Sequence, residues 1–180
     1  MKQIVKVPDV VLTTPAATIT VFDKKLTKLI DEMKASLMAT RNPKGVGLAA
    51  PQIGQSVRVF MTKPREDSLI RVFANPEIIK CSDTQTDGVP ERENKLEGCL
   101  SIPHIWGRVK RAKTLTLRFQ DEGGTHREET FTGFMATIVQ HETDHTNGIL
   151  YTQRVLEQKG KLYQSKKDDE GKEVLEEIVL

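Results

Sequence analysis

The sequence predicts an α+β fold, because two helical segments are separated by several short strands. The first helical segment covers residues 23–40, and the second lies around residues 132–147. The runs between them alternate apolar and polar side chains over only a few residues, as half-buried strands do. Short strands together with well-separated helices are typical of the α+β class.

The N-terminal helix is predicted by an apolar stripe with helical spacing. The members of the stripe are Phe22, Leu26, Leu29, Ile30, Met33 and Leu37. Lysines and Asp31 lie on the opposite face, and Asn42-Pro43-Lys44-Gly45 is expected to end the helix. We therefore expect an amphipathic N-terminal helix whose stripe packs on a sheet.

The strands are predicted from β-like runs bounded by turn residues. These runs cover residues 57–61, 69–74, 114–119, 127–131 and 149–151. Asn75-Pro76 is expected to close the second run, and residues 121–124 are expected to join the third and fourth runs in a hairpin. Residues 1–21 are expected to form an extended arm, and residues 81–96 a polar loop.

One domain is expected to span residues 1–180, with its core in residues 5–155. A chain of 180 residues can bury a proper core without disulfide bonds. The charged C-terminal tail, residues 156–180, fits either a hairpin that turns at Asp169-Glu170-Gly171 or a terminal helix. Its mixed charge predicts a solvated surface.

The composition is that of an ordinary globular protein, with 37% hydrophobic and 29% charged residues. The net charge of +2 does not indicate a nucleic-acid partner. The N-terminus lacks the features of a signal or transit peptide, and no apolar run is long enough to span a membrane. Two cysteines, Cys81 and Cys99, are too few for a disulfide framework and fit a reducing cytoplasm.

The second helix contains the pattern H-E-x-x-H within residues 140–145. In a helix, His141 and His145 lie one turn apart on the same face, where both can reach one metal ion. Glu142 is displaced by about 100° around the helix. That position is too far round for Glu142 to be a ligand, but it suits a group that handles the protons of a metal-bound water.

A catalytic metal site with two histidines needs a third protein ligand. The candidates are Cys99, Cys81, His104, His126 and the acidic residues. Cys99 is favoured because it lies in a glycine-flanked turn before a proline, and because a metal would lower the pKa of its thiol. Cys81 lies in the polar loop of residues 81–96 and is expected to be an incidental thiol.

The segment from Gly45 to Gly54 is rich in small residues and contains one amide side chain, Gln52. Small residues allow the backbone to approach a ligand closely, and an amide offers a hydrogen-bond donor. A plain turn between a helix and a strand explains the same residues, so this segment alone leaves both interpretations open.

Three blocks in order make the sequence resemble the peptide deformylases, which remove formyl from the N-terminal formylmethionine of new proteins. The blocks are residues 45–52 (Gly-Val-Gly-Leu-Ala-Ala-Pro-Gln), 97–101 (Glu-Gly-Cys-Leu-Ser) and 140–145 (Gln-His-Glu-Thr-Asp-His). The resemblance covers about residues 5–155. It implies a fold in which antiparallel strands wrap around the helix that carries the H-E-x-x-H motif.

The resemblance also implies a role for individual residues. Cys99, His141 and His145 match the metal ligands, and the fourth position of the site is expected to hold water. Glu142 matches the catalytic glutamate. The implied metal is Fe²⁺ in the cell, with Zn²⁺, Ni²⁺ or Co²⁺ as substitutes.

The remaining implied site residues bind the substrate. Gln52 and the backbone N–H of Leu100 match the groups that stabilise the developing oxyanion, and Gly45 and Gly47 lie in the segment that lines the substrate cleft. The methionine pocket is expected to be apolar. Its candidate residues are Ile53, Ile102, Trp106, Phe134, Thr137 and Ile138. Glu97, Arg111 and Asp144 are the charged residues best placed to support the ligands.

The expected partners are N-formylmethionyl peptides and nascent chains, with transient ribosome contact, no membrane and no specific nucleic acid. We expect a monomer in a bacterial cytoplasm. Two alternatives share the metal motif. A zinc peptidase of the H-E-x-x-H class usually draws its third ligand from His or Glu, and a non-catalytic metal-binding module would not need Glu142 or Gln52.

Overall fold

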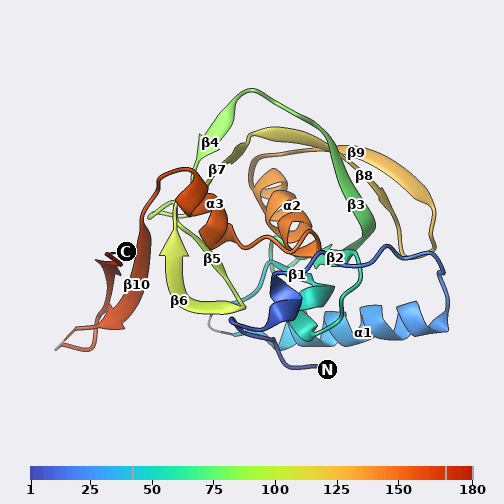
Figure 1. Ribbon diagram of the computed structural model, residues 1–180, viewed down its shortest axis with the longest axis horizontal. Helices are drawn as coiled ribbons and strands as arrows, with labels where there is room; N and C mark the ends of the chain where they lie inside the picture. Colours follow the sequence, from blue (N-terminus) through green and yellow to red (C-terminus); the bar gives the residue numbers. More distant parts are fainter. Residues whose placement is uncertain (42, 169, 180) are drawn as a thin grey trace.

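The computed structural model describes residues 1–41, 43–168 and 170–179. Its strands form three antiparallel sheets around a central helix (Figure 1). The first sheet has five strands in the order β1-β2-β3-β8-β9. They are β1 (Gly47–Ala49), β2 (Val59–Thr62), β3 (Arg71–Cys81), β8 (Thr114–Gln120) and β9 (His126–Thr132).

The second sheet has four strands in the order β11-β10-β6-β5. They are β5 (Glu97–Cys99), β6 (Ile102–Gly107), β10 (Leu162–Lys167) and β11 (Glu173–Glu177). β4 (Gln85–Asp87) and β7 (Lys110–Ala112) form a two-stranded sheet. The helices are α1 (Lys24–Ala39), α2 (Gly133–Thr146) and α3 (Tyr151–Glu157), with short 3₁₀ turns η1 (Val10–Leu12) and η2 (Ala50–Ile53).

Helix α2 is the predicted motif helix, and it lies inside the curve of the strands (Figure 1). On the side of the five-stranded sheet, Ala136 and Val139 pack in a cluster with Phe60 and Phe73. Phe60 and Phe73 stack with ring centroids 4.7 Å apart, which fixes the surface on which the helix rests. Because this packing determines the rotation of α2, it also determines where the two histidines point.

Helix α1 forms as the apolar stripe predicts. The Asp23 carboxylate caps it by accepting hydrogen bonds from the backbone N–H groups of Lys25 and Leu26. The buried side chains of the stripe pack against β1 and β2 in one core cluster, whose helical members are Leu26, Ile30, Met33 and Leu37. Of the four residues expected to end the helix, Asn42 lies outside the described residues.

Strand β3 differs from the prediction, because it continues through Asn75-Pro76 instead of ending there. The register with β8 shifts between Ala74 and Glu77, so the ladder does not need the N–H that proline lacks. Asn75 has a positive φ of 49°. Its side chain accepts from the N–H of Ile19 at 2.8 Å and replaces part of the interrupted pairing.

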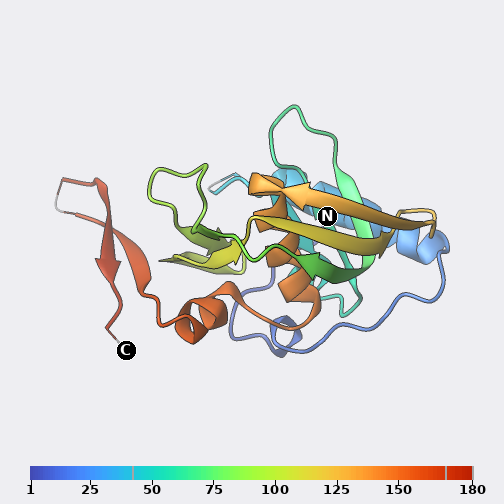
Figure 2. The same cartoon turned by 90° about the horizontal axis from the view of Figure 1, so that it is seen from above.

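The predicted strand at residues 149–151 is wrong, because Tyr151 begins helix α3. Tyr151 and Val155 are buried one helical turn apart, a spacing that so short an apolar run does not reveal. Of the two structures expected for the tail, the hairpin is the one found, although Asp169 of the predicted turn lies outside the described residues. The hairpin β10–β11 extends the second sheet because β10 pairs with β6, and it projects away from the five-stranded sheet (Figures 1 and 2).

The N-terminal arm connects two of the sequence blocks. The N–H of Val5 donates to the carbonyl of Gln52 at 2.8 Å, and the N–H of Val7 donates to the carbonyl of Ser101 at 3.1 Å. Lys6 Nζ donates to the carbonyl of Leu100. None of the described helices has the length and apolar character of a membrane span.

Candidate metal-binding active site

Cys99, His141 and His145 come together as one group of potential ligands. One ligand atom of each side chain lies within 4.8 Å of the others, and Cys99 Sγ is 3.2 Å from His145 Nε2. Cys99 ends strand β5, whereas both histidines come from α2. The other candidate ligands from the sequence, Cys81, His104 and His126, are exposed and lie outside this group.

The electrostatics of the group fit a divalent transition-metal ion. Burial alone would raise the pKa of the Cys99 thiol, but the charges and hydrogen bonds of His145 and His141 lower it well below its usual value. The backbone N–H of Ser101 also donates to Cys99 Sγ at 3.4 Å. A buried thiolate beside two imidazoles is a donor set that suits Zn²⁺ or Fe²⁺.

Glu97 orients the first histidine. Its Oε1 lies 2.6 Å from His141 Nδ1, and Arg111 binds its two oxygens at 2.6 and 2.9 Å. Burial alone would raise the pKa of Glu97, but Arg111 and His141 lower it well below its usual range. The charged Glu97 therefore holds the Nδ1 proton of His141, which leaves Nε2 free to bind an ion.

The supporting network extends beyond Glu97. Arg111 Nη1 also donates to Asp144 at 3.0 Å, and Asp144 accepts from Arg154 Nη2 at 2.8 Å. The sequence pointed to Glu97, Arg111 and Asp144, and the structure brings all three together. No sequence pattern pointed to Arg154, because residues 149–151 were expected to form a strand and the helix that carries Arg154 was not predicted.

Glu142 directly follows His141 on α2 and is buried. The residue is 4% exposed, and burial raises the pKa of its carboxyl to about 7. Its Oε2 has no hydrogen-bond partner in the part of the chain that the structure describes. A side chain at Gly47 would place a Cβ 2.3 Å from Glu142 Oε1, so only glycine lets β1 approach the carboxylate this closely.

Gln52 is buried on η2 with its amide oriented toward the group of ligands. Its Oε1 accepts from the N–H of Ala49 at 2.9 Å, which fixes the direction of the amide. Its Nε2 then donates to Cys99 Sγ and to Ser101 Oγ, each at 3.3 Å. The N-terminal arm binds the backbone carbonyls of Gln52, Leu100 and Ser101.

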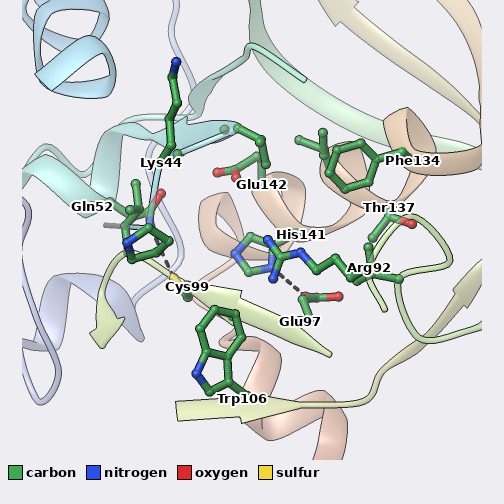
Figure 3. Close-up of a pocket in the computed structure, with 18 residues that line it drawn as sticks. Lys44, Gln52, Arg92, Glu97, Cys99, Trp106, Phe134, Thr137, His141 and Glu142 are labelled. Carbon is green, nitrogen blue, oxygen red and sulfur yellow. Dashed lines mark hydrogen bonds and ion pairs between the residues drawn. The ribbon is translucent and has the colours of Figure 1, made fainter. Parts of the chain in front are cut away.

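One pocket is lined by most of these residues (Figure 3). Gly45, Gly47, Gln52, Leu100 and Glu142 all line it, together with Cys99 and His141. The expected pocket residues Trp106, Phe134, Thr137 and Ile138 line it too, whereas Ile53 and Ile102 pack in the core instead. The sequence missed Lys44, Val89 and Arg92, which lie in segments interpreted as turns and polar loop.

A family model described as polypeptide deformylase matches residues 1–161 of the chain. The chain belongs to the peptide deformylase family. A peptide deformylase of Desulfotalea psychrophila is 40% identical over 163 residues, covering 88% of this chain and 90% of that protein. The family is metal-dependent, and Cys99, His141 and His145 form the group that could hold the ion.

Solved deformylase structures share the fold. The crystal structure of the peptide deformylase from Thermotoga maritima has a TM-score of 0.76 and 34% identity, covering 86% of this chain and 97% of that one. A Met-Ala-Ser-bound structure of the class I type b enzyme from Acinetobacter baumannii has a TM-score of 0.75 and 33% identity, covering 86% of this chain and 98% of that one. The α+β fold predicted from the sequence is therefore confirmed.

Proposed function

We propose that this protein is a metal-dependent hydrolase that removes the N-formyl group from the formylmethionine of newly made polypeptides. Membership of the deformylase family supports this activity. The structural observation that supports this activity is that Cys99, His141 and His145 lie together beside a buried glutamate, at one pocket.

Cys99 Sγ and the imidazoles of His141 and His145 would hold the ion. When bound, the ion would supply a Lewis acid and lower the pKa of a water molecule toward neutrality. We propose Fe²⁺ as the metal in the cell, with Zn²⁺, Ni²⁺ or Co²⁺ as substitutes. The mixed sulfur and nitrogen ligands are compatible with all four ions.

Glu142 is proposed to move the proton. Its carboxylate takes a proton from the attacking water and delivers it to the departing amine. A pKa of about 7 suits a group that must do both near neutral pH. Oε2, which lacks a partner among the described residues, is the oxygen available for this transfer.

Gln52 and the backbone N–H of Leu100 are proposed to stabilise the charge that develops on the formyl oxygen. Both residues line the pocket together with Cys99. Donors that are already fixed in place stabilise such a charge without reorganisation at the moment of reaction. The hydrogen bond from Ala49 to Gln52 Oε1 supplies that rigidity.

The substrate backbone is proposed to lie between two sheet edges. β1 is the edge strand of one sheet and β5 the edge strand of the other, and both border the pocket. Gly45 and Gly47 on one side and Glu97–Cys99 on the other could pair with an extended peptide. The first side chain would then enter the space above α2, which is lined by Phe134, Thr137 and Ile138.

The proposed partners are formylmethionyl peptides and nascent chains, which places the activity in the cytoplasm where bacterial chains are made. The domain assignment stays a prediction, with one catalytic domain over residues 1–180, a core in 5–155 and the tail in 156–180. A monomer with transient ribosome contact is likewise proposed from the sequence.

The test is formate release by protein purified without oxygen, with metal analysis on the same preparation. Formyl-Met-Ala-Ser should release formate, whereas the acetylated peptide and the free-amine peptide should remain intact. Cleavage of the peptide bond in the free-amine peptide would instead indicate a zinc peptidase. Tight metal binding without formate release would indicate a non-catalytic module.

A further inference from the structure

Arg92 places a positive charge in the wall of the pocket, where the sequence predicted apolar lining. It is half-buried, and its guanidinium carbon lies 5.5 Å from the centroid of the Trp106 ring. Its Nη1 donates to the carbonyl of Leu96 at 3.1 Å. Across the described residues, no carboxylate forms an ion pair with Arg92, so most of its N–H donors are uncommitted.

The loop that carries Arg92 is a built structure. The N–H of Val89 donates to the carbonyl of Lys95 at 2.9 Å, and the N–H groups of Arg92 and Lys95 form two further turns at 3.0 Å each. Gly88 has a φ of 77°, and a Cβ there would lie 2.2 Å from the Lys95 carbonyl. The loop therefore fixes where the Arg92 side chain begins.

The positive charge of Arg92 is only partly balanced by nearby negative charge. Burial lowers the pKa of its guanidinium, and the nearby charge of Glu97 only partly opposes this effect. Glu97 is already bound by Arg111 and His141. A partly desolvated cation is stabilised when a ligand presents an acceptor. An occupant of the pocket with a polar group at the right place would supply that acceptor.

The position of Arg92 selects the part of the substrate that it can reach. Successive side chains of an extended peptide point to opposite sides. If the formyl group lies near Glu142, the first side chain would therefore enter the pocket and the second would point away from it. Figure 3 shows the Arg92 side chain extending from the loop toward His141, between Thr137 and Trp106. A substrate held in this way would present its first side chain to Arg92.

We propose that Arg92 is a specificity-determining residue that donates hydrogen bonds to an acceptor at the end of the first side chain, so that this protein also deformylates N-terminal formylmethionine sulfoxide. The inference rests on the proposed deformylase function. A thioether sulfur is only a weak acceptor, whereas a sulfoxide oxygen is a strong one. The reaction is unchanged, since water adds to the formyl carbon, the C–N bond breaks, formate and the amine are released, and the sulfoxide stays oxidised.

The test compares kcat/KM for three peptides that differ only in the first side chain, namely formyl-Met-Ala-Ser, its methionine sulfoxide form and its norleucine form. Arg92→Met keeps an apolar stem and removes the donors. We expect kcat/KM for the sulfoxide peptide to fall about tenfold or more, the scale of losing a hydrogen bond from a charged donor, while the norleucine peptide changes by less than about twofold.

Arg108→Met is the matched control, because Arg108 is exposed and pairs with Asp87 at 3.1 Å outside the pocket. Arg92→Lys, which restores a donor, should recover part of the sulfoxide activity. An unchanged sulfoxide-to-norleucine ratio in Arg92→Met, or an equal change in Arg108→Met, would overturn the inference. No formate from formyl-Met-Ala-Ser with the wild-type protein would instead overturn the proposed function itself.

Discussion

The pocket centre and the C-terminal hairpin are built in opposite ways. In the centre, Gln52, Cys99, Glu142 and His145 are all less than 9% exposed, and most are held by side-chain hydrogen bonds. In the hairpin, every residue of β11 is exposed. The hairpin is held by backbone pairing and by a few apolar contacts. A substitution of one side chain there should therefore change activity and stability far less than one in the pocket centre.

The two regions also differ in whether the family model covers them. The family match ends at residue 161, one residue before β10 begins. Every proposed site residue lies before that point. The hairpin nevertheless reaches the pocket wall indirectly, because Tyr163 pairs with Trp106 across β10 and β6. Substitutions graded from the centre to the hairpin can therefore measure how far the site extends.

The largest effect is expected at Glu142. Glu142→Gln should lower kcat by about 10²- to 10⁴-fold, because a neutral amide cannot carry the proton. Metal content should remain unchanged, since Glu142 lies outside the group of ligands. Formate release and metal analysis of one preparation check both statements. Loss of the metal, or turnover close to that of the wild type, would contradict the assigned role.

A smaller loss is expected at Gln52. Gln52→Leu should reduce turnover by about 10²- to 10³-fold, the typical cost of one oxyanion donor, with metal retained. Gln55→Leu is the matched control, because within the described residues the Gln55 amide donates only to the neighbouring Gly54 carbonyl. Similar kinetics for the two variants would show that the position of Gln52 in the pocket has no catalytic value.

The substitution Asp144→Ala tests whether the network of Glu97, Arg111 and Asp144 contributes to metal binding. Asp144→Ala leaves Arg111 and Arg154 without their shared acceptor, which should weaken metal binding by about 10- to 100-fold. Removing one partner of a buried ion pair should also destabilise the fold by about 3 kcal/mol. Competition with a chelator and thermal unfolding measure the two effects. Full metal occupancy under chelator would exclude Asp144 from the metal-supporting role.

The smallest catalytic effect is expected from removing the hairpin. A chain ending at Lys161 loses the packing of Leu162 and Ile178 on the apolar cluster around Tyr151 and Val155. Burial of each such side chain contributes about 2 kcal/mol, so the loss of both should lower the unfolding midpoint by about 8–16 °C. We expect kcat/KM for formyl-Met-Ala-Ser to change less than about threefold. A much larger fall would mean that the hairpin fixes Trp106 and belongs functionally to the pocket.

Local pattern sufficed for the motif helix and for its ligands. The spacing of His141 and His145 follows from helical geometry, so the pair could be placed without a structure. Cys99 was harder, because a third ligand distant in sequence was chosen by its glycine-flanked turn and by family resemblance. The interruption at Asn75-Pro76 misled the strand prediction, since a bulge that compensates for proline depends on the partner strand β8.

The amino-acid sequence by itself determined the α+β class, the helix that carries two histidines and a glutamate, and the blocks that mark the family. These depend on residue spacing along a single element, which neighbours in sequence specify. Only the tertiary structure decided that Arg154 supports Asp144, that the N-terminal arm joins Gln52 to the Leu100 turn, and that Arg92 enters the pocket. Those contacts join segments far apart in the chain, and their partners are chosen by packing.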